Sequence, residues 1–171
     1  MALIYLIGFM GCGQSTLGKK VANKIQYEFM DLDQLIEERT SSSISDIFQK
    51  KGEEFFRVLE HQIIVEISKA KNTIIALGGG TPCYFNNLEI INETGVSLYL
   101  ERPAKELYQR IKNAKDTRPL VRSKSDEELL EFIEKLLTER SFHYQRSTYT
   151  VPRNYLTSKG LTNYILEHVA I

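Results

Sequence analysis

Short apolar runs alternate with segments of helical periodicity along the whole chain. Residues 3–7 (LIYLI), 73–77 (TIIAL) and 96–100 (VSLYL) are nearly continuous apolar runs, as expected for strands that are buried on both faces. Two weaker candidates, residues 28–30 and 149–151, bring the predicted strands to five. Alternation of strands and helices predicts βαβ units, and therefore a parallel sheet with helices on both faces.

The helical segments are predicted from apolar side chains that recur every three to four residues. Residues 15–25 show this pattern, a short helix is predicted around residues 44–48, and a terminal helix at about 158–168. Pro103 is expected in the first turn of a helix that follows the 96–100 strand. For residues 55–67 the expected apolar face consists of Phe55, Val58, Leu59, Ile63 and Ile67.

The composition is that of an ordinary globular protein, and its charge gives no reason to expect a polyanionic partner. The 171 residues include 22 basic and 22 acidic side chains, so the formal net charge is zero. Nothing therefore favours nucleic acid or an anionic membrane as a partner, and an anionic ligand must be bound by a local cluster of basic groups.

No apolar run approaches the roughly 20 residues that a membrane-spanning helix needs. The N-terminus lacks the basic start and cleavage site of a signal peptide, and we expect a strand there instead. The two cysteines, Cys12 and Cys83, form no metal-binding or CxxC spacing. We therefore expect a cytoplasmic protein with free thiols.

A glycine-rich segment, GFMGCGQST at residues 8–16, lies between a predicted strand and a predicted helix. The P-loop pattern is Gly, four residues, Gly, Lys, then Ser or Thr, and every position fits except the lysine. The glycines let consecutive backbone N–H groups point at phosphate oxygens, and the following helix adds its positive end. Without this context such a turn could equally be a packing turn with no ligand. The predicted nucleotide-binding residues are Gly11, Cys12, Gly13, Gln14, Ser15 and Thr16, with the Ser15 hydroxyl group as a ligand of Mg²⁺.

Gln14 occupies the position of the catalytic lysine. A lysine would bring a positive charge to the β- and γ-phosphates, whereas the glutamine amide is neutral. Losing one electrostatic contact to a transition state typically costs a factor of ~10² to 10³ in rate. We therefore expect strongly reduced activity. The rest of the motif is intact, which argues against gradual decay and favours a deliberate substitution over a natural low-activity variant.

Three further segments carry polar chemistry. Asp31 and Asp33 follow the 28–30 strand, where carboxylates could approach Mg²⁺ or orient a hydroxyl group and accept its proton. The alternative for Asp33 is a helix N-cap. Arg57 lies on a predicted helix, where it could bind a carboxylate through two N–H groups or simply be a surface residue. Residues 78–80 (GGG) could be a strand-ending turn, but three consecutive glycines are entropically costly and indicate a close backbone approach.

In this order, these segments resemble those of shikimate kinases over essentially the whole chain. The resemblance is carried by GFMG at residues 8–11, DLD at 31–33, FRVLE at 56–60, GGG at 78–80, TRPL at 117–120 and RSFHY at 140–144. It implies a three-layer α/β/α fold of the P-loop, nucleoside monophosphate kinase-like type, with a five-stranded parallel sheet and a mobile lid. It also implies one domain over residues 1–171, with a substrate-binding region at about 31–62 and a monomeric state.

The resemblance implies transfer of the γ-phosphate of ATP to the 3-hydroxyl group of shikimate, with Mg²⁺. Asp31 would approach the metal through water, and Asp33 would bind the substrate hydroxyl groups. Arg57 and Arg140 would bind the substrate carboxylate. The backbone amides that would approach the substrate are those of Gly78, Gly79 and Gly80.

By the same resemblance, Arg118 would close over the phosphates as part of a lid at about residues 112–125, and Arg110 would stack on adenine. Composition alone favours an exposed loop for residues 112–125. The predicted catalytic residues are Asp33, Arg118 and the lysine position Gln14.

Two alternatives stay open at this stage. A gluconate kinase-like enzyme would also bind a hydroxylated carboxylate, although the joint presence of Asp33, Arg57, the triple glycine and Arg140 favours shikimate. A non-catalytic ligand-binding module would explain Gln14, although the retained Ser15 speaks against a long-standing loss of catalysis.

Overall fold

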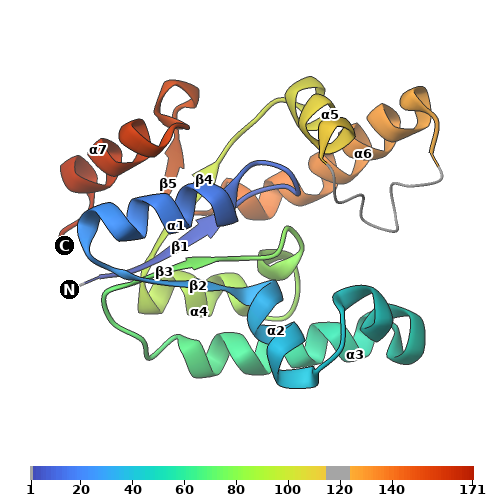
Figure 1. Ribbon diagram of the computed structural model, residues 1–171, viewed down its shortest axis with the longest axis horizontal. Helices are drawn as coiled ribbons and strands as arrows, with labels where there is room; N and C mark the ends of the chain where they lie inside the picture. Colours follow the sequence, from blue (N-terminus) through green and yellow to red (C-terminus); the bar gives the residue numbers. More distant parts are fainter. Residues whose placement is uncertain (1, 115–123) are drawn as a thin grey trace.

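The computed structural model describes residues 2–114 and 124–171, and in these residues five strands form one parallel sheet (Figure 1). The order of the strands across the sheet is β2-β3-β1-β4-β5. The predicted number of strands and their parallel arrangement are therefore confirmed. The strands are β1 (Leu3–Ile7), β2 (Glu28–Asp31), β3 (Thr73–Ala76), β4 (Val96–Leu100) and β5 (Tyr149–Val151).

The register of the central strands places two glycine-rich segments side by side. Leu6 of β1 is paired with Ala76 of β3, so Gly8 and Gly78 each lie two residues beyond this pair. The backbone N–H of Leu77 also donates to the carbonyl oxygen of Leu6 over 3.2 Å. Because all neighbouring strands are parallel, their carboxyl ends meet at one edge of the sheet, where ligands bind in open α/β folds.

Helices cover both faces of the sheet, with α1 and α7 on one face and α3 and α4 on the other (Figure 1). Every side chain of β1 and β3 is buried between these layers, which explains the continuous apolar runs in the sequence. The helices are α1 (Gln14–Ile25), α2 (Leu32–Thr40), α3 (Ile44–Ile67), α4 (Asn87–Thr94), α5 (Ala104–Asn113), α6 (Asp126–Tyr144) and α7 (Ser158–His168), with 3₁₀ turns at Thr81–Cys83 and Arg153–Tyr155.

The α3 helix differs from the prediction. A break at Gly52, where φ is 83° and ψ is 170°, separates its two halves, and in the second half Phe55 and Val58 are each 41% exposed. Ile63 and Ile67 are buried as predicted, but the other buried positions of this half are Phe56, Arg57, Glu60 and Ile64. The apolar pattern was misleading because two charged residues belong to the buried stripe. A helix that buries polar residues therefore has a different buried face from the one that its apolar residues alone predict.

Two further observations concern the starts of helices, and the first differs from the prediction. Pro103 is the N-cap of α5 and not a residue of its first turn. The α6 helix begins with a capping box, in which the Ser125 side chain accepts from the Glu128 backbone N–H and the Glu128 carboxylate accepts from the Ser125 N–H. Arg118 and the rest of the TRPL segment lie outside the described residues, as does most of the predicted lid.

Across residues 2–114 and 124–171, no helix combines the length and the apolar character that a bilayer crossing requires.

Candidate active site

The segment between β1 and α1 has the curled backbone that the glycine spacing predicts. Gly11 and Gly13 adopt φ values of 80° and 105°, a conformation that glycine tolerates far better than other residues. The N–H of Cys12 donates to the carbonyl oxygen of Phe9 over 3.0 Å, which tightens the turn. The α1 helix then begins at Gln14, so its free N–H groups face the concave side of the loop. This geometry suits the binding of phosphate groups.

The side chain of Gln14 points back into the glycine-rich loop. Its side chain is 8% exposed, and its amide nitrogen donates to the carbonyl oxygen of Gly8 over 2.8 Å and to that of Leu77 over 3.2 Å. Both amide hydrogens are thereby used to link the ends of β1 and β3. The side chain at the lysine position is thus a structural cross-link in this conformation.

Ser15 and Asp31 meet at the start of α1. The Ser15 hydroxyl group donates a short hydrogen bond to the Asp31 carboxylate. Asp31 is also the N-cap of α2, since it accepts from the backbone N–H of Gln34 over 3.2 Å. The N-cap interpretation that the sequence suggested for Asp33 therefore belongs to Asp31, and Asp33 lies in the first turn of α2.

The pair of Ser15 and Asp31 fits a magnesium ion by its chemistry. Both groups present oxygen atoms, which are the ligands that Mg²⁺ prefers. In the described part of the chain, no group of three or more His, Cys, Asp or Glu side chains could hold a metal ion. A cation beside Ser15 would therefore complete its coordination with water and phosphate oxygens, as Mg²⁺ commonly does in kinases.

The three consecutive glycines make room for three polar side chains, one each. A Cβ atom on Gly78 would lie 3.1 Å from Oδ1 of Asp33, and one on Gly79 would lie 3.1 Å from Nη1 of Arg140. A Cβ atom on Gly80 would lie only 2.6 Å from Nη2 of Arg57. The structure thus brings together the three side chains that were predicted from separate segments, around the backbone that follows β3.

Arg57 lies in a largely buried setting. Its Nη1 is 2.9 Å from the carboxylate of Glu60, which is fully buried, and its Cζ is 4.2 Å from the centre of the Tyr84 ring. Burial alone would lower the pKa of Arg57, but the charge and hydrogen bond of Glu60 outweigh it and raise the pKa above its ordinary value. Glu60 in turn accepts from the Thr81 hydroxyl group over 2.5 Å. These contacts fix the guanidinium group in one orientation.

Arg140 reaches the site from α6. Its Cζ lies 5.8 Å from the centre of the Phe9 ring, so the side chain extends over the glycine-rich loop. One turn further along α6, the buried Tyr144 donates its hydroxyl group to the carbonyl oxygen of Gly79 over 2.5 Å. Burial raises the pKa of Tyr144, so the hydroxyl group stays protonated as a donor. Two residues of the RSFHY segment therefore both contact the region of Gly79.

Arg110 and Cys12 contribute to the loop in different ways. Nε of Arg110, on α5, donates to the carbonyl oxygen of Gly11 over 2.6 Å, so this side chain covers the loop from outside. Cys12 is fully buried, and burial raises the pKa of its thiol to about 12. The thiol is therefore a core-filling group, and any contact of Cys12 with phosphate would use its backbone N–H.

Sequence reasoning assigned no role to several residues that surround Arg57. Glu60 and Glu53 lie three residues after and four residues before Arg57, a spacing that places side chains together on a helix. This spacing was a usable signal. Tyr84 and Thr81 follow β3 by several residues, and no motif indicated that they would contact α3.

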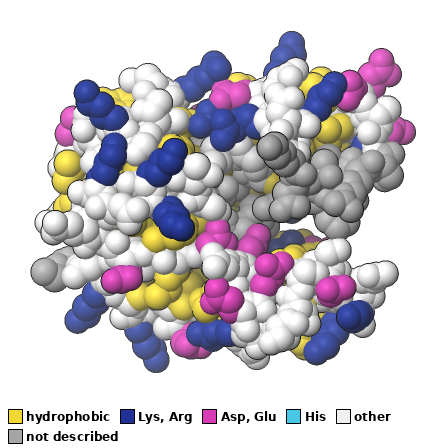
Figure 2. All heavy atoms as spheres, in the orientation of Figure 1, with side chains coloured by type: hydrophobic (Ala, Val, Ile, Leu, Met, Phe, Trp, Pro, Cys, Tyr) yellow, Lys and Arg dark blue, Asp and Glu magenta, His cyan; other side chains and the backbone are white. Residues whose placement is uncertain are grey.

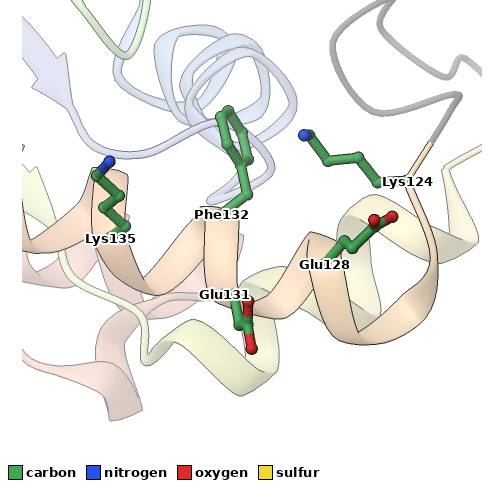
Figure 3. Close-up of a pocket in the computed structure, with 5 residues that line it drawn as sticks. All are labelled: Lys124, Glu128, Glu131, Phe132 and Lys135. Atoms are coloured by element: carbon green, nitrogen blue, oxygen red, sulfur yellow. The ribbon is translucent and has the colours of Figure 1, made fainter.

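Figure 2 shows acidic side chains gathered near the middle of the visible face, in the area of α2. A separate open pocket lies along α6 (Figure 3) and is lined by Lys124, Glu128, Glu131, Phe132 and Lys135. Its side chains are of mixed charge, and it contains none of the predicted site residues. We therefore assign the candidate site to the carboxyl ends of β1 and β3.

Comparison with known proteins identifies the family of the chain. A family model described as shikimate kinase matches residues 10–170. A shikimate kinase of Flavobacterium johnsoniae is 44% identical over 153 residues, which cover 88% of this chain and 89% of that protein.

Two solved structures are similar over nearly the full length of both chains. A shikimate kinase from Bacteroides thetaiotaomicron has a TM-score of 0.92 and 33% identity, with 97% of each chain covered. A shikimate kinase from Acinetobacter baumannii in complex with shikimate has a TM-score of 0.82 and 30% identity, with 99% of this chain and 96% of that chain covered.

Proposed function

The chain belongs to the shikimate kinase family, and on that premise we propose that it transfers the γ-phosphate of ATP to the 3-hydroxyl group of shikimate. The products are shikimate 3-phosphate and ADP. The observation that carries the proposal is the arrangement of Asp33, Arg57 and Arg140 around three glycines, next to a phosphate-binding loop. Two arginines beside a carboxylate suit a substrate that has both a carboxylate and hydroxyl groups.

At the substrate end, the two arginines bind the carboxylate, and Asp33 binds the hydroxyl groups. The backbone of Gly78, Gly79 and Gly80 lets the substrate approach closely, since a Cβ atom would collide with Arg57 at Gly80 and would crowd the polar side chains at Gly78 and Gly79. Asp33 is the residue that we expect to orient the attacking hydroxyl group and accept its proton. The substrate-binding region is thus formed by residues 31–62 together with β3 and α6.

At the phosphate end, the backbone N–H groups of residues 11–16 bind the phosphates of ATP at the start of α1. Ser15 and Asp31 are the residues that would hold Mg²⁺, Asp31 through water. When bound, the metal ion offsets the negative charge of the β- and γ-phosphates. Arg110 covers the loop from outside, where it would contact the adenine base. Arg118, which lies outside the described residues, is proposed as the further cation over the phosphates.

Catalysis in this site consists mainly of positioning. The loop holds the γ-phosphate in line with the hydroxyl group that Asp33 orients, and the arginines fix the substrate so that this alignment persists. Gln14 supplies no charge, and its amide hydrogens are bonded to the carbonyl oxygens of Gly8 and Leu77. We therefore propose that phosphate transfer is slow in this chain, while both ligands still bind.

The same observation on Gln14 favours one second candidate, a protein that binds ATP and shikimate without turnover. The two candidates share the binding site and differ only in the rate of the chemical step. We further propose a single-domain monomer that works in the cytoplasm. Both thiols are free, as is usual in that reducing compartment.

The test combines binding and turnover. Calorimetric titration of the chain with shikimate, and separately with gluconate, measures the dissociation constant for each. ADP release with saturating ATP and Mg²⁺ then gives the rate with each substrate. Shikimate binding with slow, shikimate-dependent ADP release supports the enzyme, and binding without any release supports the second candidate. Binding of gluconate but not of shikimate would refute the substrate assignment.

A further inference from the structure

One edge of the Arg57 guanidinium group is already occupied by a carboxylate of the chain itself. Oε1 of Glu53 accepts from Nε of Arg57 over 3.2 Å and from Nη2 over 3.1 Å. The hydroxyl group of Tyr84 donates to the same oxygen over 3.0 Å. An arginine binds carboxylates through just such pairs of N–H groups. Glu53 therefore takes up donors that a bound carboxylate ligand would use.

Glu53 also lies within electrostatic reach of the second arginine of the site. Its partial burial would raise the pKa of its carboxyl group, but hydrogen bonds from Tyr84 and Arg57 and the charges of Arg57 and Arg140 outweigh that effect. The pKa of Glu53 is held below its ordinary value, so the side chain is ionised at neutral pH. A negative charge thus sits beside both arginines to which we assign the substrate carboxylate.

The two acidic partners of Arg57 differ in how firmly they are held. The Glu60 side chain is 0% exposed and bonds to Nη1 of Arg57, whereas the Glu53 side chain is 53% exposed. Removing Glu60 from its partner would leave a charge in the interior, which is costly. Glu53 can instead rotate into water and keep its charge hydrated. It is the partner that a ligand can replace.

We propose that Glu53 is an internal competitor of the substrate carboxylate at Arg57, and that its charge sets the affinity for shikimate. This inference rests on the proposed function. When shikimate binds, either Glu53 rotates away from Arg57 or two carboxylates share one guanidinium group. Both outcomes oppose binding, the first through the lost hydrogen bonds and the second through repulsion of like charges. A neutral ligand with the same hydroxyl groups is not exposed to this competition.

The backbone beside Glu53 suits a side chain that changes partners. Gly52, immediately before it, has a φ of 83° and interrupts α3, so Glu53 starts the second half of the helix. Among the described residues outside Gly52 and its neighbours in the chain, no heavy atom comes within 4 Å of where a Cβ atom of Gly52 would be. The space beside Gly52 is therefore open.

A competing interpretation is that Glu53 only stabilises α3. An acidic residue four positions before an arginine, in the first turn of a helical segment, contributes a few tenths of a kcal/mol in isolated helices. In that case, loss of the charge would lower the stability of the protein and leave shikimate binding unchanged. If Glu53 instead positions Arg57 for the substrate, loss of its charge would weaken binding.

The experiment is a comparison of dissociation constants by calorimetry at neutral pH, without nucleotide. The proteins are the unaltered chain, Glu53→Gln and Glu54→Gln, which removes the same charge from the adjacent exposed side chain. The ligands are shikimate and its neutral methyl ester. We expect Glu53→Gln to bind shikimate about two- to fivefold more tightly, as expected for the loss of one partly exposed charge pair. We expect no change for the methyl ester with either variant, and no change for shikimate with Glu54→Gln.

Three results would overturn the inference. Unchanged or weaker shikimate binding by Glu53→Gln would assign Glu53 to helix stability or to the positioning of Arg57. An equal gain for the methyl ester would show that the effect does not depend on the substrate carboxylate. An equal gain for Glu54→Gln would show a general effect of net charge. If no protein in the set binds shikimate, the proposed function itself fails, and the inference falls with it.

Discussion

The side-chain amide of Gln14 donates to the backbone carbonyl oxygen of Gly8 over 2.8 Å, across the mouth of the glycine-rich loop. A second hydrogen bond from the same nitrogen, to Leu77, extends this link to the end of β3. A lysine at this position could donate to the same carbonyl oxygens when ATP is absent and turn to the phosphates when ATP is bound. Glutamine can take over the first task but not the second, because it is shorter and uncharged.

From this difference we predict that Gln14→Lys increases kcat with shikimate by ~10² to 10³, since one electrostatic contact to the transferred phosphate is restored. The KM for shikimate should stay nearly unchanged, because Gln14 does not lie among the substrate side chains. Steady-state ADP release measures both. Gln14→Met, which is apolar and similar in size, is the control and should show no gain. An equal gain with methionine would mean that the glutamine obstructs the loop and that charge is not the cause.

Gly80→Ala should displace Arg57 without disturbing the fold. The φ of Gly80 is −93°, which alanine adopts freely, but its Cβ atom would lie 2.6 Å from Nη2 of Arg57. The guanidinium group is the end of a flexible side chain and must give way. We expect shikimate affinity to fall about ten- to a hundredfold, as for the loss of hydrogen bonds to a charged group. Calorimetry with shikimate and with an ATP analogue checks this, and loss of both affinities would contradict a local effect.

The position of the candidate site could largely be predicted from the sequence, because parallel strands end at a common edge of the sheet. The apolar runs of β1 and β3 identified both strands, and each is followed by glycines, so the two glycine segments had to lie close together. The clustering of Asp33, Arg57 and Arg140 followed from the family resemblance and not from periodicity. The structure brings these three side chains to the same three glycines, while their roles in binding stay a prediction.

The sequence was less informative where polar residues are buried. The buried stripe of α3 contains Arg57 and Glu60, so a pattern based on apolar residues placed only part of the buried face correctly. Contacts that depend on loop conformation, such as Tyr84 with Glu53, carry no periodic signal at all. The side-chain conformation of Gln14 could not be predicted from the sequence either, because it depends on carbonyl oxygens of two residues that follow different strands.

The two thiols should react slowly in the folded protein. Burial raises the pKa of Cys12 to about 12 and that of Cys83 to about 11, so at pH 8 the reactive thiolate is only ~10⁻³ of Cys83 and ~10⁻⁴ of Cys12. Because both pKa values are raised, alkylation should accelerate as the pH increases, with Cys83 ahead of Cys12. Mass spectrometry after timed treatment with iodoacetamide measures this, with urea-unfolded protein as the control. Rapid labelling of native Cys12 at pH 8 would contradict its burial.

Tyr144→Phe tests whether a residue behind the substrate site supports it. The hydroxyl group of Tyr144 donates to the carbonyl oxygen of Gly79 over 2.5 Å, and Arg140 lies one turn earlier on the same helix. Without the hydroxyl group, this partly buried carbonyl oxygen loses a hydrogen bond, which costs about 0.5–1.5 kcal/mol of unfolding free energy. Urea denaturation measures that loss.

The same variant should also weaken shikimate binding, because Gly79 and Arg140 depend on each other for their spacing, while binding of an ATP analogue should be unaffected. Tyr149→Phe is the matched control. Its hydroxyl group also donates to a backbone carbonyl oxygen, that of His168 over 3.2 Å, but at an exposed position. We expect it to change unfolding by no more than about 0.5 kcal/mol and shikimate binding not at all. If Tyr144→Phe lowers stability but leaves shikimate affinity intact, the tyrosine supports the fold alone, and the position of Gly79 is set by β3 without help from α6.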